Sequence, residues 1–514
     1  MMLLLVLLCH GGLFGQSITL RPYLQAMRSD GTPPAALGGG TLTAKGSDGA
    51  IWTGTAEGLW REDPKAPPAD RKRYFASKRW LPDDHVVGLL PDSAGGMWVK
   101  TQTGVSHIEF RRMTLEDKAA YFEDRIRKRH LRHGFVASSG LAEAGNLTSN
   151  RPGSTDNDGL WTAMYAAAEC YRYAATKSPE ALSYARQAIE AILKLEEVTG
   201  FPGLPARSYL VPGEPRPHDG IWFAAPSGNI VWKGDTSSDE IVGHYYALAV
   251  AYEVLKDNAL KERIRATVKR ITDLIVKNHY TLPDIHGAPT WWGRWDPEYF
   301  QSERGKPDSP LNAVEILAFL KVAHHITEDE VYAAHYGRLA IGENYAPLTA
   351  RYKQLRETIN YSDEELAMLS FALLLGYEDD PGLRGVYRSA LDQWWENEVR
   401  EKNPLWTYIY AIANRGKQAP LEDALWTLQR IPMDLVSWTV KNSNRKDIEW
   451  VGDADRFGRR QSRTLLPADE RPVMKWNGNP FIVDGGNGGR SEDDGAFFLL
   501  PYWMGRAHRL NKGQ

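Results

Sequence analysis

From residue 113 to the C-terminus, the sequence repeats one pattern: an amphipathic stretch, a polar loop, and a stretch that is apolar on nearly all sides. Apolar residues at helical spacing predict α-helices over both kinds of stretch. A helix that is apolar all round must be buried, whereas a helix with one charged face must lie at the surface. The pattern therefore predicts helical hairpins, in which each outer helix is followed by an inner helix.

Six such pairs are present. The expected outer helices lie near 115–131, 179–197, 258–278, 345–358, 382–400 and 420–431. The expected inner helices start with the segments 154–161, 237–246, 309–315, 361–366, 403–406 and 491–497, so the last of them is expected to begin at Ser491. We therefore predict a mainly α fold, an (α/α)6 toroid of six helical hairpins over 113–514, in which the loops before the inner helices meet at one mouth.

A small β-rich segment is expected before the helices, over 17–112. Segments 49–60 and 96–105 match each other, and Trp52 and Trp98 are 46 positions apart (98 minus 52), the length of one propeller blade. These two segments resemble the propeller repeats of two-component regulators. Because propellers close with about 4–8 blades, two copies predict a small sheet packed on the rest of the chain and no closed propeller.

The first 16 residues contain a short apolar run followed by small residues, which is typical of a cleavable secretory signal peptide. A buried N-terminal strand or helix is the alternative. We expect an exported protein, periplasmic or extracellular, without a membrane segment after cleavage. Cys9 and Cys170 are the two cysteines, so the mature chain cannot form an internal disulfide. Cys170 lies in an apolar helical run, which predicts a buried, inert thiol.

The charge and composition of the chain limit the classes of function that it can have. The chain has 62 basic and 65 acidic residues, a formal net charge of −3, which argues against a nucleic-acid-binding protein. Tryptophan is abundant, with 18 residues. Part of this excess must be core, but aromatic faces also build sugar-binding pockets.

The hairpin count, the alternation of outer and inner helices, and the aspartates at the starts of inner helices resemble six-hairpin glycosidases and the related toroidal polysaccharide lyases. In unsaturated glucuronyl hydrolases, aspartates near the starts of two inner helices carry the reaction, and Asp158 and Asp239 occupy similar places here. The resemblance implies an exported glycoside hydrolase that acts on a polysaccharide or oligosaccharide, uronate-containing substrates included. It is architectural and covers roughly residues 113–510.

The candidate catalytic residues are Asp158 and Asp239, with Glu240 as a substitute, because hydrolysis needs one carboxylic acid and one carboxylate. A lyase is the alternative, with His244, which lies one helical turn beyond Glu240, as part of a set with Tyr245, Tyr361 and Arg490. Three other readings stay open. Acids at a helix start are good caps without any catalytic role, and the protein could bind a glycan without turning it over. A helical toroid could also catalyse another reaction, such as sugar epimerisation; a terpene-cyclase-like reaction is disfavoured because the sequence has no D-D-x-x-D run.

Three long loops, 198–236, 279–308 and 432–490, combine tryptophan with arginine, aspartate and asparagine, and we expect all three at the same mouth. Packing of the loops onto the helices is the alternative role of these tryptophans. The candidate substrate-binding residues are Trp161, Trp232, Trp292, Trp295, Tyr361, Glu365, Arg490 and Asp494.

No motif for another chemistry is complete. The glycine-rich run 485–490 lacks the phosphate-loop pattern, and a close approach of the backbone is the expected use of these glycines. Residues 453–455 lack the remaining ligands of a calcium loop. His324, His325 and His335 show no metal-ligand spacing, and no G-x-S-x-G elbow is present. We therefore expect a carbohydrate partner and neither a metal nor a cofactor.

Overall fold

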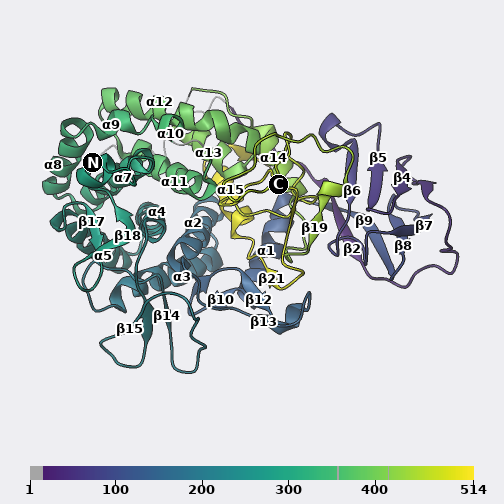
Figure 1. Cartoon of the computed structure of the whole chain (residues 1–514), viewed down its shortest axis with the longest axis horizontal. Helices are drawn as coiled ribbons and strands as arrows, with labels where there is room; N and C mark the ends of the chain where they lie inside the picture. Colours follow the sequence, from purple (N-terminus) through teal and green to yellow (C-terminus); the bar gives the residue numbers. More distant parts are fainter. Residues whose placement is uncertain (1–15, 356–357, 415, 514) are drawn as a thin grey trace.

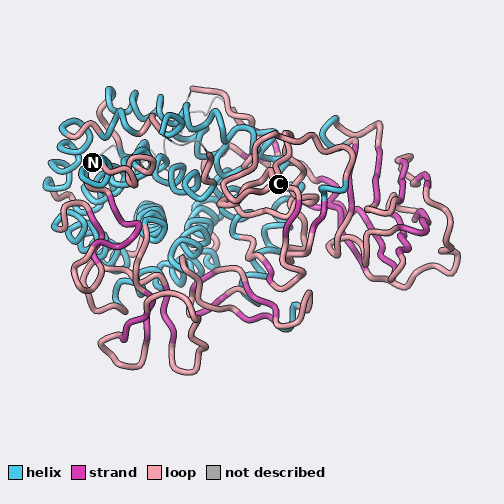
Figure 2. Tube along the Cα trace, viewed as in Figure 1, coloured by secondary structure: helices cyan, strands magenta, loops and turns pink. Residues whose placement is uncertain are grey.

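The computed structural model describes residues 16–355, 358–414 and 416–513, so the expected signal peptide lies outside the described residues except for Gln16. A large helical body makes up most of the molecule, and the strands of residues 23–113 form sheets at one end of it (Figures 1 and 2). None of the described helices is long and apolar enough to cross a membrane.

Six buried helices form the centre of the helical body: α2 (Asp158–Thr176), α4 (Ser238–Val254), α7 (Ser309–Thr327), α11 (Tyr361–Tyr377), α13 (Pro404–Ala413) and α15 (Ala496–Ala507). Their contacts run from α15 through α2, α4, α7, α11 and α13 back to α15. The helices that precede or follow them along the chain are α1 (Leu115–Arg129), α3 (Pro179–Glu197), α5 (Asn258–Lys277), α8 (Glu330–Gly337), α12 (Pro381–Glu398) and α14 (Leu421–Arg430). The inner helices are buried on nearly all faces, as their sequences predict.

The connections differ in length at the two ends of the helices. An inner helix passes to the next outer helix through a short turn, and Ser178, Asp257, Asp329 and Asp380 each cap the outer helix that follows by accepting a bond from a backbone N–H. The return from an outer to an inner helix is usually long, as over 198–237, 278–308 and 431–495. The starts of the inner helices are therefore the ends that the long loops approach.

Two expected helices differ from the structure. The expected outer helix over 345–358 is wrong: α8 follows α7 directly, and a π-helical turn (Arg338–Gly342) then leads into the short helices α9 (Tyr345–Leu348) and α10 (Tyr352–Leu355). Asn344, with φ 58°, interrupts this stretch. The last inner helix begins at Ala496, because β21 (Ser491–Glu492) is paired in a sheet and Gly495 turns the chain with φ 88°.

The N-terminal strands form two four-stranded antiparallel sheets with the orders β2-β9-β8-β7 and β3-β4-β5-β6. Their bounds are β2 (Tyr23–Ser29), β3 (Thr43–Lys45), β4 (Ile51–Gly54), β5 (Leu59–Glu62), β6 (Lys72–Phe75), β7 (Val86–Pro91), β8 (Met97–Thr101) and β9 (Val105–Met113). Trp52 lies on β4 and Trp98 on β8, so the two matching segments occupy corresponding strands. A separate apolar core, which includes Trp52, holds the sheets together.

Short strands border the helical body (Figure 2). They are β1 (Ile18–Thr19), β10 (Leu131–Arg132), β11 (Phe135–Val136), β12 (Ser139–Leu141), β13 (Asn150–Arg151), β14 (Ser208–Leu210), β15 (Trp222–Ala224), β16 (Val231–Lys233), β17 (Thr281–Pro283), β18 (Pro289–Arg294), β19 (Val440–Lys441), β20 (Asp484–Gly485) and β22 (Asn511–Lys512). The pairing of β1 with β22 is parallel and joins the two ends of the described chain.

A buried ionic network attaches the sheets to the helical body. The Asp469 carboxylate accepts bonds from Arg73 of β6 (3.0 Å) and from Arg430 of α14 (2.9 Å). The Asp469 carbonyl accepts two more, from the Arg79 guanidinium and the Trp80 indole N–H, both at 3.2 Å. Asp469 is 2% exposed and Arg430 4% exposed. Because a buried charge is costly unless it is paired, these contacts fix how the sheets dock.

Candidate functional site

A pocket of about 420 Å³ lies where the starts of α4, α7 and α11 come together. The loop after α14 forms its other side, through residues 455–459 and 477–479. Four of its lining residues are aspartates, so we call it the acidic pocket: Asp239, Asp308, Asp363 and Asp455. Asparagine, arginine and aromatic side chains complete the lining.

Asp239 is in the first turn of α4 and has one carboxylate oxygen open to the pocket. Its Oδ2 accepts a bond from the Ser237 hydroxyl at 3.0 Å, and its Oδ1 has no hydrogen-bond partner among the described residues. Burial raises the pKa of Asp239 despite this bond. Because no backbone N–H of the described chain binds this carboxylate, Asp239 is not a hydrogen-bonding cap and is available to a ligand.

Asp308 and Asp363 stand at the starts of the neighbouring helices. Asp308 accepts a bond from the Tyr299 hydroxyl at 2.9 Å, and Asp363 accepts one from the Asn360 amide at 2.5 Å. Glu315 of α7 is fully buried close to these acids and accepts a bond from the Trp295 indole at 2.7 Å. Burial raises the pKa of Glu315 far above its usual value, and the charges of Asp239, Asp363 and Asp308 raise it further. Burial and the neighbouring acids therefore both favour the protonated form of Glu315.

A second group of charges lies next to Asp239. Lys475, from the long loop, forms an ion pair with Asp494 at 3.0 Å, and its ammonium lies 4.6 Å from the centre of the Trp161 ring. Glu365 of α11 is 2% exposed. Burial raises the pKa of Glu365 to about 8; the charge of Lys475 opposes this rise, and the charge of Asp239 adds to it. At neutral pH, Glu365 is therefore a protonated acid near an aspartate.

Aromatic side chains border the acidic pocket on opposite elements. Trp292 of β18 is 49% exposed, and Phe457 of the long loop is 67% exposed. Tyr361, at the start of α11, is nearly buried and packs with Leu465 and Phe481. Exposed aromatic faces beside carboxylates and amides suit a sugar ring, which has both apolar C–H faces and hydroxyl groups.

Asp455 shapes the loop side of the pocket. Its Oδ1 accepts bonds from the backbone N–H groups of Phe457 and Arg459, both at 2.9 Å, and its Oδ2 accepts one from the Arg459 side chain at 2.8 Å. This turn presents Phe457 and the neighbouring Arg456 to the pocket. The acids at 453–455 thus organise a turn. No three His, Cys, Asp or Glu side chains of residues 16–355, 358–414 and 416–513 are arranged to hold a metal ion.

Asp158 lies outside the acidic pocket and is 1% exposed. Its Oδ2 accepts bonds from Arg132 at 2.6 Å and from Ser208 at 2.5 Å, while its Oδ1 binds the Thr155 hydroxyl at 2.7 Å. Burial raises the pKa of Asp158, and these partners oppose the rise. Asp158 therefore connects α2 to β10 and β14.

Glu240 and His244 are buried in the wall between α2 and α4. The Glu240 carboxylate accepts a bond from the backbone N–H of Gly159 at 3.1 Å, so it caps the neighbouring helix. His244 is fully buried, its Nδ1 lies 2.7 Å from the Glu240 carbonyl oxygen, and burial lowers its pKa to about 4. Neither side chain lines the acidic pocket.

The other predicted binding residues are dispersed. Trp232 is 2% exposed and packs against Phe223, and Trp295 is fully buried against Glu315. Arg490 is exposed and does not line the acidic pocket. Of the predicted set, Asp239, Trp292 and Tyr361 line the pocket. Trp161, Glu365 and Asp494 lie around Lys475 instead.

The sequence analysis did not assign a site role to several lining residues: Asp308, Asn312, Asp363, Asp455, Arg456, Phe457, Arg459, Asn477 and Asn479. A signal existed for two of them. Asp308 directly precedes α7, and Asp363 lies in the first turn of α11, as Asp239 does in α4. No comparable signal marks residues 455–459, since they reach the pocket only through the path of a long loop.

No protein-family model matches the chain, and no curated protein matches it. Among solved structures, a glycoside hydrolase family 76 mannosidase of Bacteroides thetaiotaomicron is similar at 9% identity, over 76% of this chain and 98% of that chain, with a TM-score of 0.40. A cellobiose 2-epimerase of Bacillus thermoamylovorans is similar at 11% identity, over 76% and 99%, with a TM-score of 0.36.

A family 76 glycoside hydrolase from a bovine Bacteroides thetaiotaomicron strain is similar at 9% identity, over 92% of this chain and 98% of that chain, with a TM-score of 0.38. Likeness at this level transfers neither a substrate nor a reaction to this chain. The chemistry of the site must be inferred from its own residues.

Proposed function

We propose that this chain is a carbohydrate-active enzyme, a glycoside hydrolase that binds its substrate in the acidic pocket. The observation that carries this proposal is the acidic pocket itself, in which Asp239 lies beside the exposed rings of Trp292 and Phe457, with the buried Glu365 close enough for the charge of Asp239 to act on it. Asp239 has one oxygen open to the pocket, and the nearby Glu365 is protonated at neutral pH, with a pKa of about 8. Hydrolysis of a glycosidic bond needs one carboxylate and one carboxylic acid.

In this proposal, Glu365 donates a proton to the oxygen of the leaving sugar, and Asp239 acts as the carboxylate. It either activates a water molecule, which gives inversion, or attacks the sugar carbon, which gives retention. Trp292 and Phe457 contact the sugar rings at the border of the pocket. Asp158, which the sequence pattern favours as the partner of Asp239, serves in this scheme as a support for α2.

The same proposal includes an (α/α)6 toroid over 113–514, a β-rich domain over 17–112 related to propeller repeats, and export through the N-terminal segment. The cyclic order of contacts among the six inner helices supports the toroid. The two four-stranded sheets with Trp52 and Trp98 on corresponding strands support the repeat relationship.

The first test is a screen of the purified protein on polysaccharides and oligosaccharides, with two simultaneous readouts. New reducing ends without a rise in ultraviolet absorbance would support hydrolysis. A rise from a 4,5-unsaturated uronate would instead support a lyase. Binding without either signal would indicate a glycan-binding protein.

Two variants then test the assignment. Asp239→Asn and Glu365→Gln should each lower kcat by about 10²–10⁴-fold, the usual contribution of a general acid or base. Asp158→Asn should act mainly on stability. Full turnover by Glu365→Gln would exclude Glu365 as the proton donor.

A further inference from the structure

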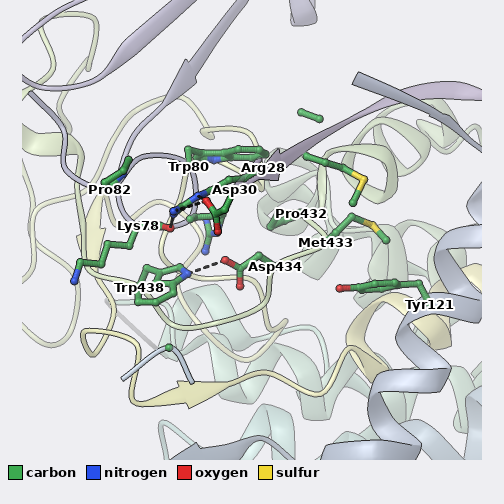
Figure 3. A pocket seen from close by; sticks show the side chains of 14 residues that line it. Arg28, Asp30, Lys78, Trp80, Pro82, Tyr121, Pro432, Met433, Asp434 and Trp438 are labelled. Atoms are coloured by element: carbon green, nitrogen blue, oxygen red, sulfur yellow. Dashed lines mark hydrogen bonds and ion pairs between the residues drawn. The ribbon is translucent and has the colours of Figure 1, made fainter. Parts of the chain in front are cut away.

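A second, larger pocket of about 570 Å³ lies at the junction of the N-terminal sheets and the helical body (Figure 3). Its walls come from the end of β2, the turn after β6, helix α1 and the start of the loop after α14. We call it the seam pocket, and its residues used below are Arg28, Asp30, Trp80, Tyr121, Asp434 and Trp438. It has no lining residue in common with the acidic pocket, and its volume is in the range of small-molecule sites, about 300–1,000 Å³.

The Trp438 indole is held in a fixed orientation at this pocket. Its Nε1 donates a bond to Asp434 Oδ2 at 2.7 Å. Two glycines with positive φ approach the ring: a Cβ on Gly145 would lie 2.2 Å from Cη2, and a Cβ on Gly489 would lie 2.5 Å from Cζ3. Gly486 packs equally closely on the Trp438 carbonyl oxygen, at 1.9 Å from such a Cβ. The glycines of 485–490 thus allow the backbone to approach Trp438 closely, a use that the sequence predicts for them. They position an indole that is only half-buried.

Polar groups of both signs surround this ring. Arg28 donates bonds to Asp30 at 3.0 Å and to the Lys78 carbonyl oxygen at 2.6 Å. In Figure 3, the hydroxyl end of Tyr121 points toward the side formed by Asp434 and Trp438. That hydroxyl has no hydrogen-bond partner within the described part of the chain.

This combination indicates the chemical class of the ligand. An aromatic ring can stack on the apolar face of a sugar, while carboxylates, a guanidinium and a phenol hydroxyl can bind its hydroxyl groups. Strong binding of a phosphate or sulfate would instead use arginines that are free to form paired bonds. The lining also contains Lys78 and Arg79. Arg28 is already bonded to Asp30, Arg79 donates bonds to the carbonyl oxygens of Asp469 and Arg471 at 3.2 and 3.4 Å, and the Lys78 side chain extends away from Asp434 and Tyr121 in Figure 3. Because Asp434 adds a negative charge, a neutral ligand fits this pocket better than an anion.

We propose that the seam pocket is a second saccharide-binding site, which holds a neutral segment of a glycan away from the acidic pocket. The choice of a glycan rests on the proposed function, whereas the preference for a neutral segment rests on the seam residues. Because the walls come from both the sheets and the helical body, this site exists only when the two are docked.

The test measures binding by isothermal titration calorimetry, with mannohexaose, cellohexaose, xylohexaose and hexagalacturonate as probes. The background variant Asp239→Asn/Trp292→Ala weakens the acidic pocket and blocks turnover. In this background we add Trp438→Phe or Tyr121→Phe. Trp222→Ala, which changes a half-buried tryptophan outside both pockets, is the matched control.

We expect the background variant to bind a neutral hexasaccharide with one remaining site. Trp438→Phe and Tyr121→Phe should each weaken this binding, by about tenfold for Trp438→Phe, whereas Trp222→Ala should leave it unchanged. Tyr121→Phe removes a single hydroxyl, so it keeps the test valid if Trp438→Phe disturbs folding; the unfolding midpoint of each variant checks this.

Three results would each overturn the proposal. The first is that no neutral hexasaccharide binds the background variant, and the second is that Trp438→Phe and Tyr121→Phe bind it as tightly as the background variant does. The third is that hexagalacturonate binds the seam pocket more tightly than the neutral probes. Turnover by the native chain decides the proposed function separately. Turnover without seam binding would refute only the second site, and seam binding without turnover would refute only the hydrolase.

Discussion

Replacement of Glu365 by glutamine should make the protein more stable, and the gain should grow with pH. Glu365 is 2% exposed, and burial raises its pKa from 4.5 to about 8. Between these two values, the unfolded chain releases a proton that the native chain retains, so the native state loses stability as pH rises. Below pH 4.5, the carboxyl group is protonated in both states and this effect disappears.

The size of the effect follows from the same interval. With roughly 1.4 kcal/mol for each pH unit, the rise from 4.5 to about 8 corresponds to a loss of up to about 5 kcal/mol in the free energy of unfolding. Between pH 5 and pH 7, the loss is about 3 kcal/mol. Glutamine has nearly the same shape and does not titrate, so Glu365→Gln should be free of this loss.

The assay is urea denaturation of the native chain and Glu365→Gln at pH 5, 6, 7 and 8, followed by far-ultraviolet circular dichroism. The difference in unfolding free energy should increase by about 1.4 kcal/mol for each pH unit. Glu303→Gln, at an exposed position, is the control and should give a difference that does not change with pH. Parallel pH profiles for the native chain and Glu365→Gln would refute the buried, protonated state of Glu365. If Glu365 is the proton donor, as proposed, turnover of the native chain should fall as pH rises through about 8, because Glu365 then loses its proton.

Three further predictions concern other parts of the molecule. Asp239→Asn should abolish most turnover while leaving the unfolding midpoint nearly unchanged, because its carboxylate accepts a bond only from the Ser237 hydroxyl; a large loss of stability would instead indicate a structural acid. Trp292→Ala should raise KM by about fivefold to tenfold and leave kcat unchanged, since the ring is half exposed and, in the proposed function, stacks on the substrate without taking part in proton transfer; steady-state kinetics decide this, and an unchanged KM would exclude the stacking role. Asp469→Ala should lower the free energy of unfolding by about 3–5 kcal/mol, because Arg73 would remain buried without its carboxylate and Arg430 would keep only Asp70 and Glu470; a stability equal to that of the native chain, measured by urea denaturation, would show that the network does not hold the sheets.

The inner and outer helices were largely predictable because burial acts on every turn of a helix. The expected range 179–197 coincides with α3, and the expected start at Tyr361 coincides with that of α11. The expected helix over 345–358 was not found, because the break after α9 divides that stretch, and Asn344 in a left-handed conformation separates it from the turn before it. Helical periodicity indicates which face of a helix is buried, but it says little about where the helix is interrupted.

The candidate site was predictable only where it depends on helix starts. Asp239 lies in the first turn of α4, as the sequence pattern at the start of this helix predicts. The ion pair between Lys475 and Asp494, and the proximity of Lys475 to Glu365, arise because a loop folds back over the helix starts. Sequence spacing cannot predict such a contact, because a long loop without periodicity can approach any of the six inner helices.

The connections at the two ends of the inner helices differ in length. This difference separates the residues proposed for catalysis, at the helix starts, from the loop residues proposed for binding. Short turns fix each inner helix to the next outer helix, so a residue in the first turn of α4 or α11 has its position set by a closely packed core. The positive ends of these helices also favour carboxylates there, which opposes the cost of burying several acids together. The long loop after α14 has no such constraint, yet it supplies Phe457 to the acidic pocket, Lys475 to the group of charges around Glu365, and Trp438 to the seam pocket. Substitutions at the helix starts should therefore act on kcat, whereas changes in this loop should act on binding at both pockets.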